Sequence, residues 1–179
     1  YNERVSSVFE KLFQTPLPSE LKPTNLLHVT CTGYLSPSPA QNWVTQQEWG
    51  KLCQVIHLYH MGCYASIPAI RIAKALIQGK GGSTFIKHNE LCTLHFSPWD
   101  SSPEQLVIQS LFSDGHIGYF VTMPDKPING LEILSDKEMI IPNSHQDMSW
   151  SPGAYGFNMG LSPLVPKKIT EQLPFFLRE

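Results

Sequence analysis

The sequence contains few charged residues, and those it has are nearly balanced in sign. Asp, Glu, Lys and Arg make up 16% of the 179 residues, below the ~25% typical of soluble proteins, and the formal net charge is -2. There is no basic run, which excludes nucleic-acid or membrane binding driven by electrostatics. The hydrophobic fraction of 41% excludes intrinsic disorder. We therefore expect much of this weakly charged surface to contact other protein.

Long apolar runs are also missing. No stretch approaches the ~20 residues that a membrane-spanning helix needs, and the opening Tyr1-Asn2-Glu3-Arg4 does not resemble a signal peptide. The length fits a single domain, for which ~100–200 residues is usual. These features predict a soluble protein located in the cytoplasm.

The four cysteines contain no CxxC pair, which excludes the usual zinc-ribbon and thioredoxin-type motifs. Cys53, His57, His60 and Cys63 lie close together, but residues 54–60 read as a buried strand. Alternation along that strand directs His57 and His60 to opposite faces, where both are expected to pack or hydrogen-bond near a sheet. No glycine-rich nucleotide signature occurs, since Gly79, Gly81 and Gly82 end a predicted helix. We expect neither a metal site nor a cofactor.

Hydrophobic periodicity predicts an α/β fold. The predicted helices cover residues 4–14, 39–48, a segment from Cys63 to about residue 77, 104–112 and 164–177, and the predicted strands cover 26–31, 54–60, 84–92 and 117–123. Residues 131–134 and 138–141 read as a hairpin. Strands that alternate with helices imply right-handed βαβ crossovers and a mainly parallel sheet with flanking helices.

One junction could carry a catalytic residue, because Gly62 and Cys63 connect a predicted buried strand to a predicted helix. A thiolate at a helix N-terminus meets unpaired N–H groups and the positive end of the helix dipole, and both lower a thiol pKa from ~8.5. The same N–H groups could hold an oxyanion formed at an acyl carbonyl. On this pattern alone Cys63 is equally well explained as a nucleophile or as one of many buried, inert cysteines.

Several motifs in one order resemble the chalcone synthase-like, or type III, polyketide synthases of the thiolase fold. They are His60-Met61-Gly62-Cys63-Tyr64-Ala65, Ile70-Arg71-Ile72-Ala73-Lys74, Thr30-Cys31-Thr32-Gly33, Asn89-Glu90-Leu91-Cys92 and Gln109-Ser110-Leu111-Phe112-Ser113-Asp114-Gly115. The resemblance covers nearly the whole chain. The wording Tyr59-His60-Met61-Gly62-Cys63-Tyr64 is most similar to bacterial members, including stand-alone ketosynthases that join two acyl chains into an α-pyrone.

The resemblance implies one half of a thiolase-like fold and an acyltransferase role for Cys63. Cys63 would accept an acyl group as a thioester from acyl-CoA or an acyl carrier protein, and a carbanion made by decarboxylation would then attack it. Phe112 matches the family's gatekeeper aromatic, with core packing as the equal alternative. Phe157 matches a second pocket aromatic. His95 matches a pocket-lining position, although a hydrogen-bonded strand histidine is the simpler explanation.

Three matched positions outside the pocket have simpler interpretations. Glu90 corresponds to a buried family carboxylate, which we expect to be structural. Asp114 and Gly115 read as a turn.

The family's catalytic His and Asn lie in His-Pro-Gly-Gly and Gly-Asn-Met-Ser motifs, and neither occurs here. We therefore expect residues 1–179 to be the N-terminal portion of a ketosynthase, inactive alone and dimeric in the complete enzyme. We favour a fragment of a larger protein over a chain whose partner subunit supplies the rest. Two alternatives remain open. One is a cysteine hydrolase of the α/β type, which would need a base from His88, His95, His116 or His145. The other is a non-catalytic partner subunit.

Overall fold

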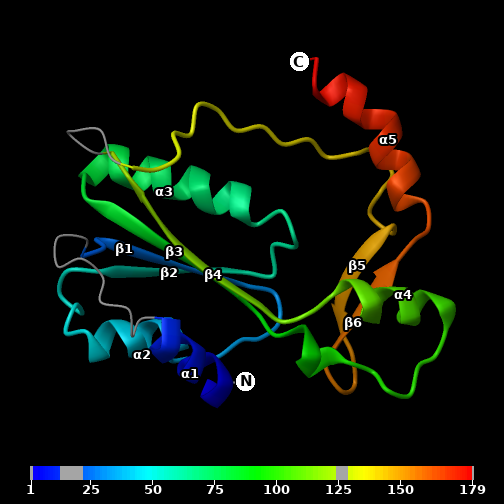
Figure 1. Ribbon diagram of the computed structural model, residues 1–179, viewed down its shortest axis with the longest axis horizontal. Coiled ribbons are helices and arrows are strands. Elements are labelled where there is room, and N and C mark those ends of the chain that lie inside the picture. The colour runs from blue at the N-terminus through cyan, green and yellow to red at the C-terminus, as the bar shows by residue number, and fades with distance from the viewer. Residues whose placement is uncertain (1, 13–21, 124–128, 179) are drawn as a thin grey trace. The chain divides into compact units, whose positions relative to one another are not determined.

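A computed structural model describes residues 2–12, 22–123 and 129–178 (Figure 1). The chain forms two compact units. The first contains residues 1–91 and 115–136, and the second contains residues 92–114 and 137–179. None of the helices in the described ranges is long and apolar enough to cross a membrane.

The first unit is built on a four-stranded sheet with the order β2-β1-β3-β4. The strands are β1 (Asn25–Thr30), β2 (Gln54–Tyr59), β3 (Ser83–Glu90) and β4 (Gly115–Thr122). Strand β1 pairs in parallel with both β2 and β3, whereas β4 runs antiparallel to β3. The α/β class and the mainly parallel sheet are thus confirmed, and the direction of β4 is the one departure from repeated βαβ units.

Three helices flank this sheet, with α3 on one face and α1 and α2 on the other (Figure 1). They are α1 (Asn2–Leu12), α2 (Pro39–Gln46) and α3 (Ser66–Lys80). Helix α3 ends as the glycine cluster predicts, because Gly81 has a φ of 72° and closes the last turn onto Ile77 O. Of the predicted helix 4–14, residues 13 and 14 lie outside the described residues, as do the side chains of Phe9 and Leu12.

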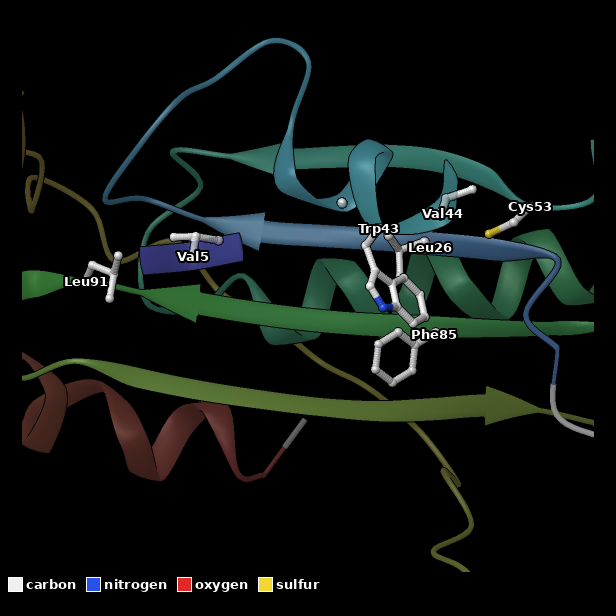
Figure 2. Packing of buried hydrophobic residues seen from close by; sticks show 8 residues of the cluster. Val5, Leu26, Trp43, Val44, Cys53, Phe85 and Leu91 are labelled. Carbon is white, nitrogen blue, oxygen red and sulfur yellow. The ribbon is translucent and has the colours of Figure 1, made fainter. Parts of the chain in front are cut away.

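The core under α1 and α2 is an apolar cluster spread along the strands of the sheet (Figure 2). Phe85 of β3 lies beside Trp43 of α2, with ring centroids 6.3 Å apart, and its centroid is 4.8 Å from that of Phe120 on β4. The other buried members are Val5, Leu26, Ala40, Val44, Cys53 and Leu91. Helix α2 is fixed over this cluster by Ser38, whose side chain accepts a hydrogen bond from Gln41 N while the Gln41 side chain accepts one from Ser38 N.

The opposite face is covered by α3 and is apolar along the centre of the sheet. Small residues of the helix allow close approach to the strands. The buried members are Leu27, Val29, Leu58, Ala65, Ala69, Ala73 and Ile86. This layer fixes where α3 begins, and therefore where the chain between β2 and α3 lies.

The second unit contains η1 (Cys92–His95), α4 (Pro103–Leu111), β5 (Met148–Pro152), β6 (Phe157–Leu161) and α5 (Val165–Phe176). Helix α5 matches the predicted final helix. The predicted hairpin of residues 131–134 and 138–141 is wrong, since these described segments form no strand. Leu131 is 100% exposed and Ile140 is 88% exposed, so their apolar pattern has no described surface to pack on. The hairpin of this region is instead β5–β6, which the sequence patterns missed.

Candidate active site

The carboxyl ends of three parallel strands bring the candidate residues of the first unit together. Cys31 follows β1, the segment from His60 to Cys63 follows β2, and Glu90 is the last residue of β3. In open α/β sheets this edge is where ligands bind. Strand order β2-β1-β3 places the Cys31 segment between the other two.

Cys63 lies in an exposed turn, not in the core. The turn comprises Cys63, Tyr64 and Ala65, and α3 begins at Ser66 rather than at Cys63. Ile67 N donates to Tyr64 O at 3.0 Å, so the entry to the helix is already tightened. The predicted strand-to-cysteine-to-helix order is confirmed with a helix start three residues later. The alternative of a buried cysteine is wrong, whereas the role of Cys63 as a nucleophile stays a prediction.

The backbone leading to Cys63 is in an unusual conformation. His60 has a φ of 57° and Gly62 has a φ of 87°. Glycine adopts such angles without cost, whereas a side chain at φ > 0 costs on the order of 1 kcal/mol. A Cβ on Gly62 would meet nothing closer than 3.8 Å, so glycine is needed here for its backbone angle and not for space.

Glu90 joins the ends of β3 and β1. Its carboxylate accepts hydrogen bonds from Cys31 N at 3.0 and 3.1 Å and from Thr32 Oγ1 at 2.8 Å. Burial raises the pKa of this carboxyl group, while the bonds from Thr32 and Cys31 act to lower it. All of these partners belong to the segment after β1, which agrees with the structural role expected for Glu90.

Cys31 contacts the backbone of the turn that carries Cys63. Its sulfur accepts a hydrogen bond from Gly62 N at 3.2 Å. Burial raises the pKa of the Cys31 thiol, so it stays protonated at neutral pH. Cys31 is therefore an uncharged hydrogen-bond acceptor. It lies in the segment after β1 and binds the backbone N–H of Gly62, the residue before Cys63.

The two histidines of the 54–60 segment hydrogen-bond near the sheet, as predicted. His57 Nε2 is bonded to Ser38 Oγ at 2.7 Å, and His60 Nδ1 is bonded to the Tyr34 hydroxyl. Because His60 follows β2 in a left-handed conformation, strand alternation does not govern its direction. Among the described residues no group of three or more His, Cys, Asp or Glu side chains could hold a metal ion.

A row of basic side chains crosses the face of the sheet that α1 and α2 cover. His28 pairs across strands with His57 on β2 and with Lys87 on β3, and both His28 and Lys87 are almost completely buried. Burial above all, together with the positive charges of His57, Lys87 and His88, lowers the pKa of His28 to about 3. Burial also lowers the pKa of Lys87 to about 8. This row is polar where the rest of the layer is apolar, and periodicity did not predict it.

Acid is expected to unfold the protein through His28. Its folded-state pKa lies below the unfolded value of ~6.5, so the unfolded chain binds the proton first as the pH falls. Stability is unaffected by His28 above about pH 6.5, and then falls by about 1.4 kcal/mol per pH unit down to about pH 3. His57 and His88 act in the same direction, whereas the raised pKa of Glu90 acts in the opposite one.

The measurement is urea unfolding at several pH values from 7 to 4, for the wild type and His28→Leu. The variant is expected to show the shallower fall, by about 1 kcal/mol per pH unit. Equal slopes in the two proteins would mean that His28 does not carry the acid sensitivity.

In the second unit the structure brings His95 and Phe157 together. Phe157 N donates to His95 Nδ1 at 3.1 Å, and the ring centroids are 5.3 Å apart. Trp150 of β5 completes this aromatic cluster, 5.0 Å from His95 and stacked on Phe157 at 5.3 Å. His95 lies in η1, so the expectation of a strand histidine is wrong in its element and right in its hydrogen bond.

Phe112 caps the end of α4 and is partly buried. Its N–H donates to Ile108 O at 3.0 Å. Whether it acts as a gatekeeper stays a prediction. Cys63 belongs to the first unit, while Phe112, His95 and Phe157 belong to the second.

Three residues of these clusters were missed by the sequence patterns. Tyr34 and Trp150 occur in turn-rich or short segments without periodicity, so no local signal singles them out. Cys31 was noted only as part of a motif, and its role depends on a cross-strand contact to Gly62.

Known proteins with a similar sequence or fold agree with this architecture. A family model described as chalcone and stilbene synthases, N-terminal domain, matches residues 19–123. "Probable polyketide synthase 1" of Dictyostelium discoideum is 26% identical over 159 residues, which is 86% of this chain and 5% of that protein.

Among solved structures, the C-terminal type III polyketide synthase domain of "Steely1" from Dictyostelium superposes with a TM-score of 0.83 at 24% identity, over 99% of this chain and 52% of that one. The 1,3,6,8-tetrahydroxynaphthalene synthase of Streptomyces coelicolor A3(2) gives 0.77 at 22% identity, over 97% and 53%. PKS-I of the brown alga Ectocarpus siliculosus gives 0.83 at 18% identity, over 97% and 47%.

This chain spans about half the length of these solved structures and a small part of the Dictyostelium protein. They share its α/β half-fold, with a mainly parallel sheet and flanking helices, as the motif resemblance implied. Because the family model matches more than half of its residues, the chain belongs to the chalcone and stilbene synthase family, in the N-terminal domain that carries the Cys63 turn.

Proposed function

We propose that this chain is the cysteine-bearing N-terminal half of a type III polyketide synthase, with Cys63 as the acyl acceptor. The observation that carries the proposal is the placement of Cys63, exposed on a turn at the carboxyl edge of the parallel sheet. That edge is where α/β sheets bind ligands. An exposed thiol there can meet a thioester, whereas a thiol in the core cannot.

The proposed step is a transthioesterification. The Cys63 thiolate attacks the carbonyl carbon of an acyl thioester, a new C–S bond forms, and the C–S bond to the leaving thiol breaks. A carbanion produced by loss of CO₂ from a malonyl or β-ketoacyl thioester then attacks the acyl-Cys63 carbonyl. The new C–C bond releases the Cys63 thiolate for the next cycle.

Several parts of this reaction are supplied from outside the described residues. We propose that a C-terminal half, in the same or another polypeptide, provides the His and Asn that polarise the thioester and hold the enolate. We also propose acyl-CoA as donor, with an acyl carrier protein as the second donor class, and a homodimeric, cytoplasmic enzyme. An α-pyrone product stays a prediction that follows from the amino-acid sequence around Cys63.

The acyl pocket is proposed to include Phe112, His95 and Phe157. Support comes from the second unit, where the imidazole of His95 contacts Phe157 and is held by its N–H. Trp150 enlarges this aromatic wall. Such a wall suits an apolar acyl chain, since aromatic rings offer large apolar area.

The proposal is tested by incubating the full-length enzyme, which includes the C-terminal half, with an acyl-CoA and measuring its intact mass. We expect an increase equal to one acyl group, located on Cys63 by peptide mapping. When malonyl-CoA is added, the adduct should turn over to a condensed product. Steady release of free acid would instead identify a thioester hydrolase, and absence of any adduct in the full-length enzyme would leave the non-catalytic partner as the better explanation.

A further inference from the structure

The residues that lead into Cys63, His60 to Gly62, are held by three hydrogen bonds to the end of β1 and the segment after it. His60 N donates to Thr30 O at 3.0 Å, and Gly62 N donates to Cys31 Sγ at 3.2 Å. The third bond joins the side chains of His60 and Tyr34. These bonds come from His60 and Gly62, so they fix the backbone that leads directly into Cys63.

These hydrogen bonds stabilise a backbone that is strained. His60 occupies the left-handed region at a φ of 57°, where residues with a side chain are uncommon. Strained backbone persists only where surrounding contacts determine it, and such residues cluster at functional sites. Without its partners from the β1 segment, His60 would be expected to return to an extended conformation and to redirect the residues after it.

The partner segment is itself held in place. Glu90 accepts from Cys31 N at 3.0 and 3.1 Å and from Thr32 Oγ1 at 2.8 Å, and Leu91 N donates to Thr32 Oγ1 at 2.9 Å. The ring of Tyr34 rests edge-on against Tyr59 with centroids 5.4 Å apart. Cys31 and Tyr34 therefore present their acceptor and hydroxyl groups from a segment anchored to both neighbouring strands.

From this geometry we infer that Cys31 and Tyr34 are positioning residues for Cys63, which act by holding the His60–Gly62 backbone in its left-handed turn. Cys31 acts as a neutral sulfur acceptor for Gly62 N, and Tyr34 holds the His60 imidazole. The inference rests on the proposed role of Cys63 as acyl acceptor. Neither residue is expected to touch the acyl group or to bond to it.

The test compares Cys31→Ala, which removes the acceptor, with Cys31→Ser, which keeps one, and adds Tyr34→Phe. The first measurement is hydrogen exchange of the Gly62 and His60 amides by NMR. Exchange of the Gly62 amide should become about 10-fold faster in Cys31→Ala and stay within about 3-fold of the wild type in Cys31→Ser. In Tyr34→Phe the His60 amide should be the one that exchanges faster.

The second measurement is the rate of Cys63 alkylation by iodoacetamide, resolved by peptide mapping because Cys31 is itself a thiol. Cys31→Ala and Tyr34→Phe should react at Cys63 about 5-fold more slowly, since the released backbone no longer holds the Cys63 thiol in its exposed position. Cys31→Ser should recover most of the wild-type rate. A role in stability alone would not produce this recovery.

Two control variants separate positioning from general destabilisation. Cys53→Ala removes a buried thiol from the cluster around Trp43, at the opposite end of β2 from the turn, and Tyr155→Phe alters a tyrosine that is 98% exposed. Both should leave the Cys63 alkylation rate within 2-fold of the wild type. The inference is overturned if Cys31→Ala and Tyr34→Phe also stay within 2-fold, or if Cys31→Ser fails to recover. Because alkylation needs no acyl donor, it decides this question even if the wild type forms no acyl adduct.

Discussion

Replacing Cys63 with alanine is expected to abolish covalent acyl loading, from one group per chain to below about 5% occupancy. The reason is the contrast among the four thiols. Cys63 is exposed, whereas burial raises the pKa of Cys53 to about 11 and also raises that of Cys31. Thiolates are the reactive form, so Cys53 and Cys31 contribute little at neutral pH. The measurement is intact mass after incubation with an acyl-CoA at pH 7.5.

The matched control for this experiment is Cys92→Ala. Cys92 is a partly buried thiol at the start of η1, in the other unit of the chain. The Cys92→Ala protein should load to the same occupancy as the wild type. An adduct that persists in Cys63→Ala, or one that disappears only in Cys92→Ala, would assign the acyl acceptor to a different thiol.

Replacing Phe85 with alanine is expected to lower the free energy of unfolding by about 4 kcal/mol. Phe85 is 5% exposed and its ring lies beside Trp43 of α2 (Figure 2), while its centroid is 4.8 Å from that of Phe120 on β4. A Cβ added at Gly118 would lie 2.7 Å from Phe85 Cζ, so the ring fills the space that this glycine leaves. Its removal leaves a cavity between two elements, α2 and the sheet, that cannot easily close.

Urea unfolding at pH 7 measures this effect, with Phe175→Ala as the control. Phe175 lies on α5 and is 61% exposed, so its removal should change stability by no more than about 0.5 kcal/mol. A loss below about 1.5 kcal/mol in Phe85→Ala would show that the cluster relaxes around the missing ring.

Much of the fold could be predicted because periodic segments have local causes. The helix after Cys63 shows its small buried face and its terminal glycines directly in the sequence, and α3 accordingly ends at Lys80. The predicted hairpin at 131–141 failed for a physical reason. Apolar alternation becomes a strand only when a partner strand and a covering layer are present, and Leu131 has neither among the described residues.

The candidate site, like the fold, could be predicted only in part. Sequence motifs identified Cys63, His95, Phe112 and Phe157. The structure places His95 against Phe157, whose backbone N–H donates a hydrogen bond to His95 Nδ1. The contribution of Trp150 could not be predicted, because β5 has only five residues and such a short strand gives a weak sequence pattern for its pairing with β6. The roles of these residues in binding an acyl chain stay predictions.

The sequence by itself determined the α/β class, the family, and the identity of Cys63 as the candidate nucleophile, because each of these is written in local patterns and motif order. Tertiary structure alone decided that Cys63 is exposed, that α3 starts at Ser66, and that Cys31 and Tyr34 hold the turn before it. These features depend on which strands are neighbours. Parallel pairing of β1 with β2 aligns chain segments about thirty residues apart, and no local pattern contains that alignment.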